Sequence, residues 1–169
     1  EISSGLVGSE MCIRDSYTLN NSLDNDLWQT IKNEVSLRID AEPTLSPYLN
    51  LLVLSQESLI SAIASVISSK LNSDALASKD IKNFILDVYK NCDGIAESLE
   101  KDLLFFKEND PACKYFSTPI LFYKGFQGLA AYRAANCLWK NDRHTMALFI
   151  QNRASEVFGV DIHPAAEIL

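Results

Sequence analysis

The chain has few of the residues that build common catalytic and metal centres. His144 and His163 are its two histidines, so a metal centre made of several imidazoles is excluded. The four cysteines form no C-x-x-C pair, which argues against a zinc site and a compact disulfide framework, and a reducing cytoplasm fits them best. The sequence contains neither a G-x-S-x-G elbow nor a glycine-rich phosphate loop, so hydrolase and nucleotide-binding motifs have no support.

Clustered positive charge and long apolar runs are also lacking. The formal net charge is -7, and the fifteen basic residues are scattered, so nucleic acid and anionic membrane surfaces are not expected partners. Runs such as Leu51 to Leu54 fall far short of the roughly 20 residues that cross a bilayer. The hydrophobic content of 47% with 22% charged residues is that of an ordinary soluble domain.

Glycine is absent between Gly8 and Gly94, which leaves long stretches free to be helical. Apolar residues recur there, and further along the chain, at intervals of three and four. The third predicted helix has a serine-rich second face and is expected to be half buried. The pattern predicts about seven helices, over residues 24–40, 46–54, 55–71, 78–93, 95–106, 118–139 and 142–157.

After Gly159 the pattern changes from helical to extended. Val160-Asp161-Ile162 alternates as a strand does, and Ile162 and Ile168 stand six residues apart. A six-residue apolar period is typical of a parallel β-helix, although two isoleucines at this spacing also arise by chance.

Three places in the sequence carry candidate chemistry. Asp161 and His163 would share one face of a strand, where a carboxylate orients an imidazole base. Asp110, in the turn Asn109-Asp110-Pro111, is either a turn residue or a binding carboxylate, and the turn role is favoured. His144 is expected to be a solvated surface residue.

The glycine pair Gly125-Phe126-Gln127-Gly128 matches the G-x-x-G of some RNA-binding loops only in letters. Its apolar flanks at helical spacing favour close helix packing instead.

Several ordered motifs together resemble the serine acetyltransferases of bacteria and plants over residues 24–168. Earlier matches are Leu27-Trp28, Glu34, Glu42-Pro43 and Lys70-Leu71. The later ones are Asp110-Pro111-Ala112, Ser117-Thr118-Pro119, Tyr123-Lys124-Gly125-Phe126, Ala131-Tyr132-Arg133 and Val160-Asp161-Ile162-His163-Pro164-Ala165-Ala166.

The resemblance implies transfer of acetyl from acetyl-CoA to the L-serine hydroxyl, the step that commits serine to cysteine synthesis. Asp161 matches the aspartate that orients the general-base histidine. That histidine itself belongs to a later Leu-Asp-His segment, which this chain does not reach. His163 matches a non-catalytic position. Asp110 matches the ligand of the substrate amino group. No metal and no bound cofactor are implied, acetyl-CoA being a co-substrate.

The resemblance also implies a fold and an assembly. An all-α amino-terminal domain, residues 17–158, is expected to lead into the truncated start of a left-handed parallel β-helix, residues 159–169. Residues 1–16 resemble a translated sequencing adapter and are expected to be non-native. Family members continue Ala-Ala-Lys-Ile-Gly where this chain has Glu167 and Leu169.

The family further implies a pair of trimers joined through helical domains, a cytoplasmic location, and a carboxyl-terminal tail that docks O-acetylserine sulfhydrylase. Without the β-helix this chain is expected to be inactive by itself. The alternative function is a non-enzymatic helical module for oligomerisation.

Overall fold

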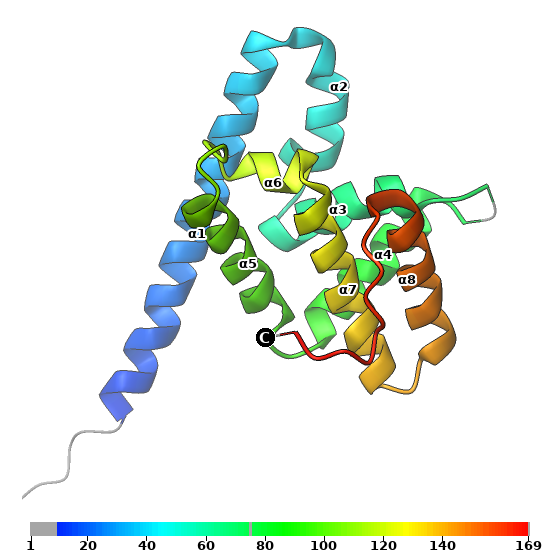
Figure 1. Ribbon diagram of the computed structural model, residues 1–169. Coiled ribbons are helices and arrows are strands. Elements are labelled where there is room, and N and C mark those ends of the chain that lie inside the picture. Colours follow the sequence, from blue (N-terminus) through cyan, green and yellow to red (C-terminus); the bar gives the residue numbers. More distant parts are fainter. Residues whose placement is uncertain (1–9, 75, 169) are drawn as a thin grey trace, which may run out of the picture.

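The computed structural model describes the backbone of residues 10–74 and 76–168 (Figure 1). Side chains are described from residue 26 onward within those ranges. All regular elements in this described part are helical, as the sequence predicts. None of these helices is long and apolar enough to cross a membrane.

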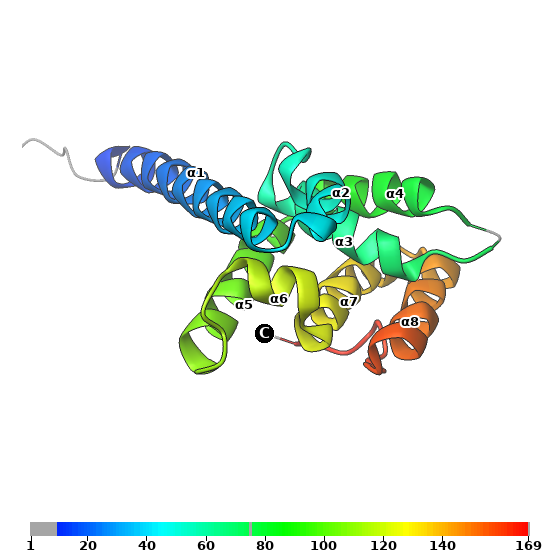
Figure 2. The same ribbon diagram turned by 90° about the horizontal axis from the view of Figure 1, so that it is seen from above.

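The first half of the fold is a long helix followed by a hairpin-like return. Helix α1 (Glu10–Ala41) leads through a short 3-10 turn, η1 (Pro43–Leu45), into α2 (Ser46–Leu49) and the π-helical turn η2 (Asn50–Leu54). Pro43 stands at the start of the 3-10 turn, where its missing amide hydrogen costs no helical bond. Figure 2 shows α1 extending well away from the other helices.

Helix α1 begins earlier than its apolar pattern predicts. The predicted start was Asp24, whereas the helix starts at Glu10, inside the segment 1–16 that resembles an adapter. Residues 1–9 of that segment lie outside the described residues, so the expectation that it is non-native stays a prediction.

Helix α3 (Leu59–Leu71) is the most enclosed element of the fold. It packs against α4 (Ser78–Asn91), α7 and α8, and ten of its thirteen residues are buried. The serine face is buried as well as the apolar face, with Ser68 donating its hydroxyl to the Ala64 carbonyl at 2.6 Å. The prediction of a half-buried helix was therefore wrong. Serine side chains are small and can donate their hydroxyls to carbonyls of their own helix, so neighbouring helices can approach this face closely.

The second half contains α5 (Ile95–Asn109), α6 (Ser117–Phe122), α7 (Lys124–Lys140) and α8 (His144–Phe158). Helix α7 lies centrally and contacts α3, α4, α5, α6 and α8 (Figure 1). The predicted boundaries of the fifth and last helices are close to those observed. Asp142, where the last helix was predicted to begin, has a φ of 57° in the turn after α7, and no side chain caps α8.

The predicted helix 118–139 is broken in two at Tyr123, which has an extended conformation. Side chains replace the backbone bonds that the break removes at the end of α6. Gln127 donates to the Ile120 carbonyl at 2.8 Å, and Lys70 contacts the Leu121 carbonyl and the Gln127 side-chain oxygen. The described part of the chain thus has eight α-helices rather than about seven.

The segment 160–168 was expected to start a β-helix, but it forms no strand within these described residues. It runs back along α7, where Asn136 donates to the Pro164 carbonyl at 2.7 Å and the Tyr132 hydroxyl donates to the Ala166 carbonyl (Figure 1). Side chains of α7 therefore satisfy the Pro164 and Ala166 carbonyls, which have no strand partner among the described residues.

The cysteines were expected to form neither a zinc site nor a compact disulfide framework, and one disulfide joins two of them. Cys92, which follows α4, and Cys137 on α7 form a disulfide with their Cα atoms 6.4 Å apart. Spacing in the sequence does not show this pair because 45 residues separate them. Cys113 is a buried free thiol.

Candidate functional site

Asp110 ends α5 and forms a tight turn with the residues that follow it. One carboxylate oxygen accepts the Ala112 amide at 2.9 Å, and the Asp110 carbonyl accepts the Cys113 amide at 2.9 Å. The Asp110 amide donates to the Phe106 carbonyl at 3.1 Å, which ties the turn to the last turn of α5. The carboxylate therefore has a fixed orientation at the junction of α5 and α6.

Two titratable side chains share the surroundings of Asp110. Burial raises the pKa of the Cys113 thiol, and the negative charge of Asp110 raises it further. Desolvation, followed by the charge of Asp110, raises the pKa of the Tyr123 phenol. Both groups therefore stay protonated near neutral pH, and Asp110 supplies the negative charge of this small cluster.

Helix α1 holds the end of the loop that begins at Asp110. Both carboxylate oxygens of Glu34 accept backbone amides, from Phe116 at 3.1 Å and from Ser117 at 2.7 Å. One turn further along α1, Arg38 donates to the Ser117 hydroxyl at 3.1 Å and to the Thr118 hydroxyl at 2.6 Å. We call Glu34 and Arg38 the α1 clamp.

Asp161 and His163 are close in sequence but have different partners. Asp161 is exposed and accepts the Gln151 side-chain amide at 2.8 Å. His163 accepts the Ala165 amide at its Nδ1, at 3.1 Å, and its ring stands edge-on to Trp139 with centroids 4.9 Å apart. The structure therefore does not join these two side chains as an acid and base pair.

His144 also contacts Trp139, with ring centroids 4.2 Å apart, and half of its side chain is exposed. Its Nε2 is 3.8 Å from a carboxylate oxygen of Asp142, whose side chain is almost fully exposed. The described residues contain no group of three or more side chains that could hold a metal ion.

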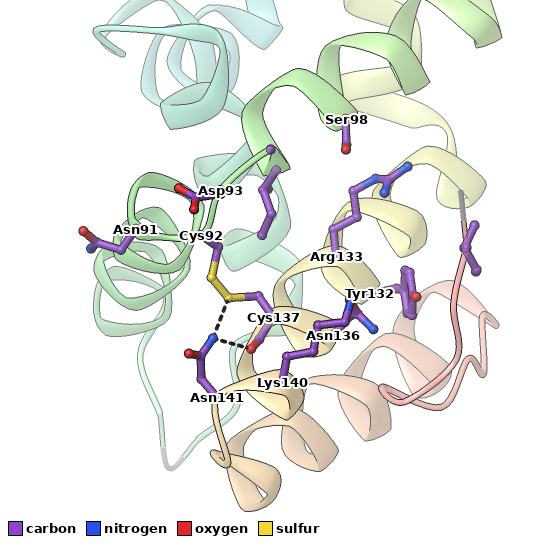
Figure 3. Close-up of a pocket in the computed structure, with 13 residues that line it drawn as sticks. Asn91, Cys92, Asp93, Ser98, Tyr132, Arg133, Asn136, Cys137, Lys140 and Asn141 are labelled. Carbon is purple, nitrogen blue, oxygen red and sulfur yellow. Dashed lines mark hydrogen bonds between the residues drawn. A yellow bond between two sulfur atoms is a disulfide. The ribbon is translucent and has the colours of Figure 1, made fainter.

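A cavity of about 450 Å³ lies between the α4–α5 turn and α7. Figure 3 shows Arg133, Asn136 and Lys140 on its α7 side, with the Cys92–Cys137 disulfide in its wall. Neither Asp110 nor Asp161 lines it. Asp110 follows α5 and is half-buried, whereas Asp161 follows α8 and is exposed.

Comparison with known proteins decides the family. The sequence model described as "Serine acetyltransferase, N-terminal" matches residues 27–131, more than half of the chain. The chain belongs to the serine acetyltransferase family.

Individual members of the serine acetyltransferase family agree with this assignment. Serine acetyltransferase 4 of Arabidopsis thaliana is 40% identical over 148 residues, which are 88% of this chain and 42% of the plant enzyme. The Neisseria gonorrhoeae enzyme solved in complex with serine is 42% identical, with a TM-score of 0.80 over 82% of this chain and 58% of that one. A serine acetyltransferase solved in complex with CoA has 32% identity and a TM-score of 0.82 over 86% and 61% of the two chains.

The chain spans about half the length of the curated serine acetyltransferases that it matches. The family model describes the amino-terminal part of these enzymes, and its match covers Asp110 and the α1 clamp but ends before Asp161.

Sequence reasoning missed Arg38, Cys113 and Tyr123 as neighbours of the Asp110 loop, and it quoted Glu34 without a role. One signal was present. Glu34 and Arg38 are four residues apart beside the buried Ile31 and Val35, so two charges flank the face that α1 turns to the core. Such a position favours a tertiary partner over a solvated one.

Proposed function

We propose that this chain is the amino-terminal part of an enzyme that transfers acetyl from acetyl-CoA to the hydroxyl of L-serine. The products are O-acetyl-L-serine and CoA, and the step provides carbon for cysteine synthesis. Membership of the serine acetyltransferase family carries the proposal, supported by similar folds whose solved structures hold serine or CoA.

Asp110 is the proposed ligand for the ammonium group of L-serine. Its carboxylate is oriented by the Ala112 amide, and the neighbouring thiol and phenol are uncharged near neutral pH. A carboxylate facing a primary ammonium forms a charge-assisted hydrogen bond, about twice as strong as a neutral one. This arrangement favours an amino acid over a hydroxy compound that lacks the amine.

Asp161 is the proposed partner of the general-base histidine. It is exposed after α8 and accepts a bond from the neutral Gln151 amide, so an imidazole N–H from a following segment would meet an available carboxylate. The carboxylate would fix the imidazole tautomer and stabilise the imidazolium as the serine hydroxyl loses its proton. His163 has a structural role beside Trp139 in this proposal.

The left-handed β-helix, the general-base histidine and the acetyl-CoA site are placed in the part of the protein that follows these residues. The chain spans about half of its relatives, which leaves room for such a domain. We propose that residues 17–158 form the helical domain and that 159–169 lead into the β-helix. By itself the chain would bind no acetyl-CoA and would be inactive.

Assembly is proposed to take place through the helical domain. Large apolar side chains are exposed along α1, η1, α2 and η2, namely Leu37, Leu45, Tyr48 and Leu51. Leu37 and Leu51 are 64% and 67% exposed, and apolar side chains that gather on neighbouring elements are typical of an interaction surface. This supports a homo-oligomer of paired trimers, and it is also the observation that favours the second candidate function, a non-enzymatic oligomerisation module.

We further propose that the enzyme is cytoplasmic, because acetyl-CoA is an intracellular substrate. A carboxyl-terminal tail is proposed to bind O-acetylserine sulfhydrylase. The Cys92–Cys137 disulfide would be open to reduction in that compartment.

The deciding experiment measures thiol release from acetyl-CoA with the protein produced from its complete reading frame. Release that depends on L-serine, with O-acetyl-L-serine found by mass spectrometry, is expected. Asp110→Asn should raise the KM for L-serine, and Asp161→Asn should lower kcat by about 10²–10⁴-fold. Asp142→Asn, a change at an exposed carboxylate, is the matched control and should leave both constants unchanged.

Two results separate the proposals. Absence of serine-dependent thiol release from the complete protein would leave the oligomerisation module as the function. Light scattering of the 169-residue chain tests assembly separately, and a strictly monomeric chain at high concentration would contradict helical-domain pairing.

A further inference from the structure

The loop that carries Asp110 has little burial to hold it. Pro111, Ala112, Lys114 and Tyr115 are exposed, and Cys113 is the buried residue among these five. The turn at Asp110 is built largely from its own backbone, with Cys113 and Lys114 amides donating to carbonyls two or three residues earlier. A loop of this kind keeps one position only if both of its ends are fixed.

The two ends are fixed by different elements. At its start, the Asp110 amide bonds to the Phe106 carbonyl of α5. At its end, Glu34 of α1 accepts the Phe116 and Ser117 amides, a contact that joins residues 82 and 83 positions apart. A carboxylate that accepts two successive amides specifies both the position and the direction of the backbone there.

Arg38 strengthens the same end of the loop. Besides its bonds to the Ser117 and Thr118 hydroxyls, its guanidinium lies over the Tyr115 ring, 5.1 Å from the centroid, and over the Phe122 ring at 5.7 Å. Ser117 is 1% exposed, so these bonds are shielded from water. The α1 clamp thus holds four consecutive residues, 115–118, by backbone, hydroxyl and ring contacts.

We propose that Glu34 and Arg38 are positioning residues for substrate binding, which act by fixing the loop that presents the Asp110 carboxylate. This inference rests on the proposed function of Asp110 as the ligand of the L-serine ammonium. Neither clamp residue touches the substrate. When the α1 clamp is weakened, the Asp110 carboxylate is no longer held in one position, so L-serine binds more weakly. The acetyl-CoA site and the catalytic groups in the following part of the protein keep their geometry.

The test is steady-state kinetics of Glu34→Gln in the protein produced from its complete reading frame. Glutamine has one acceptor oxygen, so one of the two loop amides loses its partner and meets an N–H₂ group instead. The KM for L-serine should rise about tenfold, with kcat and the KM for acetyl-CoA within twofold of the wild type.

Two further variants separate geometry from charge and from folding. Glu34→Asp keeps the negative charge but is one methylene too short to hold both amides, so it should also raise the KM for L-serine. Arg38→Lys keeps the positive charge but cannot donate to both hydroxyls as the guanidinium does. The KM for L-serine is expected to rise about threefold. If Glu34→Gln does not fold, these two milder variants decide the question.

Arg153→Gln is the matched control. Arg153 also fixes backbone far away in sequence, donating to the Leu71 carbonyl at 3.1 Å and the Asn72 carbonyl at 2.7 Å, but at the end of α3. It should lower the thermal midpoint without changing the KM for L-serine.

Three results would overturn the inference in an active enzyme: an unchanged KM for L-serine in Glu34→Gln, a Glu34→Asp enzyme identical to the wild type, or the same rise in Arg153→Gln. A wild-type enzyme with no activity toward L-serine would instead overturn the proposed function itself, and with it the role assigned to the clamp.

Discussion

Gly128 and Val160 lie so close together that a Cβ atom built on Gly128 would stand 2.7 Å from Cγ2 of Val160 and 2.8 Å from its Cβ. Gly128 is the fifth residue of α7, and Val160 begins the segment that leaves α8. The glycine thus lets the returning chain lie directly on the α7 backbone. The sequence predicted close helix packing at the Gly125 and Gly128 pair, whereas the close neighbour of Gly128 is this non-helical segment.

Replacing Gly128 with alanine should therefore lower the free energy of unfolding by about 1–3 kcal/mol, because the methyl group forces Val160 away from α7. Chemical denaturation measures this. The matched control is Gly125→Ala, whose Cβ would lie 3.7 Å from the nearest atom, Cζ of Phe106, at ordinary contact distance. Alanine should stabilise the helix there by up to about 1 kcal/mol, and equal effects at both glycines would contradict the packing argument.

The disulfide between Cys92 and Cys137 closes a loop of 45 residues that contains all of α5. Opening it should lower the free energy of unfolding by about 2–4 kcal/mol, mainly because the unfolded chain gains freedom. Thermal unfolding with and without a thiol reductant tests this. The Cys92→Ser/Cys137→Ser double variant is the control, since the reductant should leave it unaffected; a wild-type chain that is equally indifferent would show that the bond is absent.

Asp102 and Arg133 form an ion pair between α5 and α7 whose side chains are only 13% and 11% exposed. Two bonds join them, one of them from Nη2 to Oδ1 at 2.7 Å. Arg133→Met leaves the partly buried carboxylate unpaired and should lower the free energy of unfolding, measured by urea denaturation, by about 1–3 kcal/mol. Lys101→Met removes the exposed pair with Glu97 and should have no measurable effect. Similar losses in both variants would refute the shielding of the Asp102 pair.

Cys113 offers a chemical probe of Asp110 that needs no substrate. Burial and then the Asp110 charge raise the pKa of its thiol, and the thiolate is the reactive form, so alkylation of this buried thiol should be slow and should accelerate at higher pH than for an ordinary thiol. In Asp110→Asn the charge is removed, the pKa falls, and the midpoint of the pH profile should move to lower pH. Peptide mapping by mass spectrometry follows this one cysteine, and an unmoved midpoint would show that the carboxylate lies too far away to act on it.

The helices were predictable because their signals are local. The apolar spacing of Ile81, Phe84, Ile85 and Val88 fixes α4 without knowledge of its neighbours, and the turn at Asp110 is encoded in Asn109-Asp110-Pro111. The break at Tyr123 was not predictable in this way. It depends on Lys70, from another helix, and on Gln127, which satisfy the carbonyls that α6 leaves open.

The candidate site, too, has parts that local motifs predict and parts that depend on contacts across the fold. Asp110 and Asp161 could be named from motifs, but their surroundings arise from contacts across the fold. Glu34 meets Ser117 over 83 positions, and no periodicity within α1 indicates that partner. For the same reason the sequence did not show where residues 160–168 lie, since Tyr132 and Asn136 of α7 bind carbonyls of that segment.

The length of chain between Glu34 and Ser117 also sets an order of events during synthesis. A ribosome that adds about 5–20 residues per second delivers Ser117 several seconds after Glu34. Helix α1 therefore emerges long before its partner, and α2 to α5 are made in the interval. The loop with Asp110 is anchored only when translation has passed the start of α6, so a nascent chain interrupted before that point has formed helices but no fixed carboxylate.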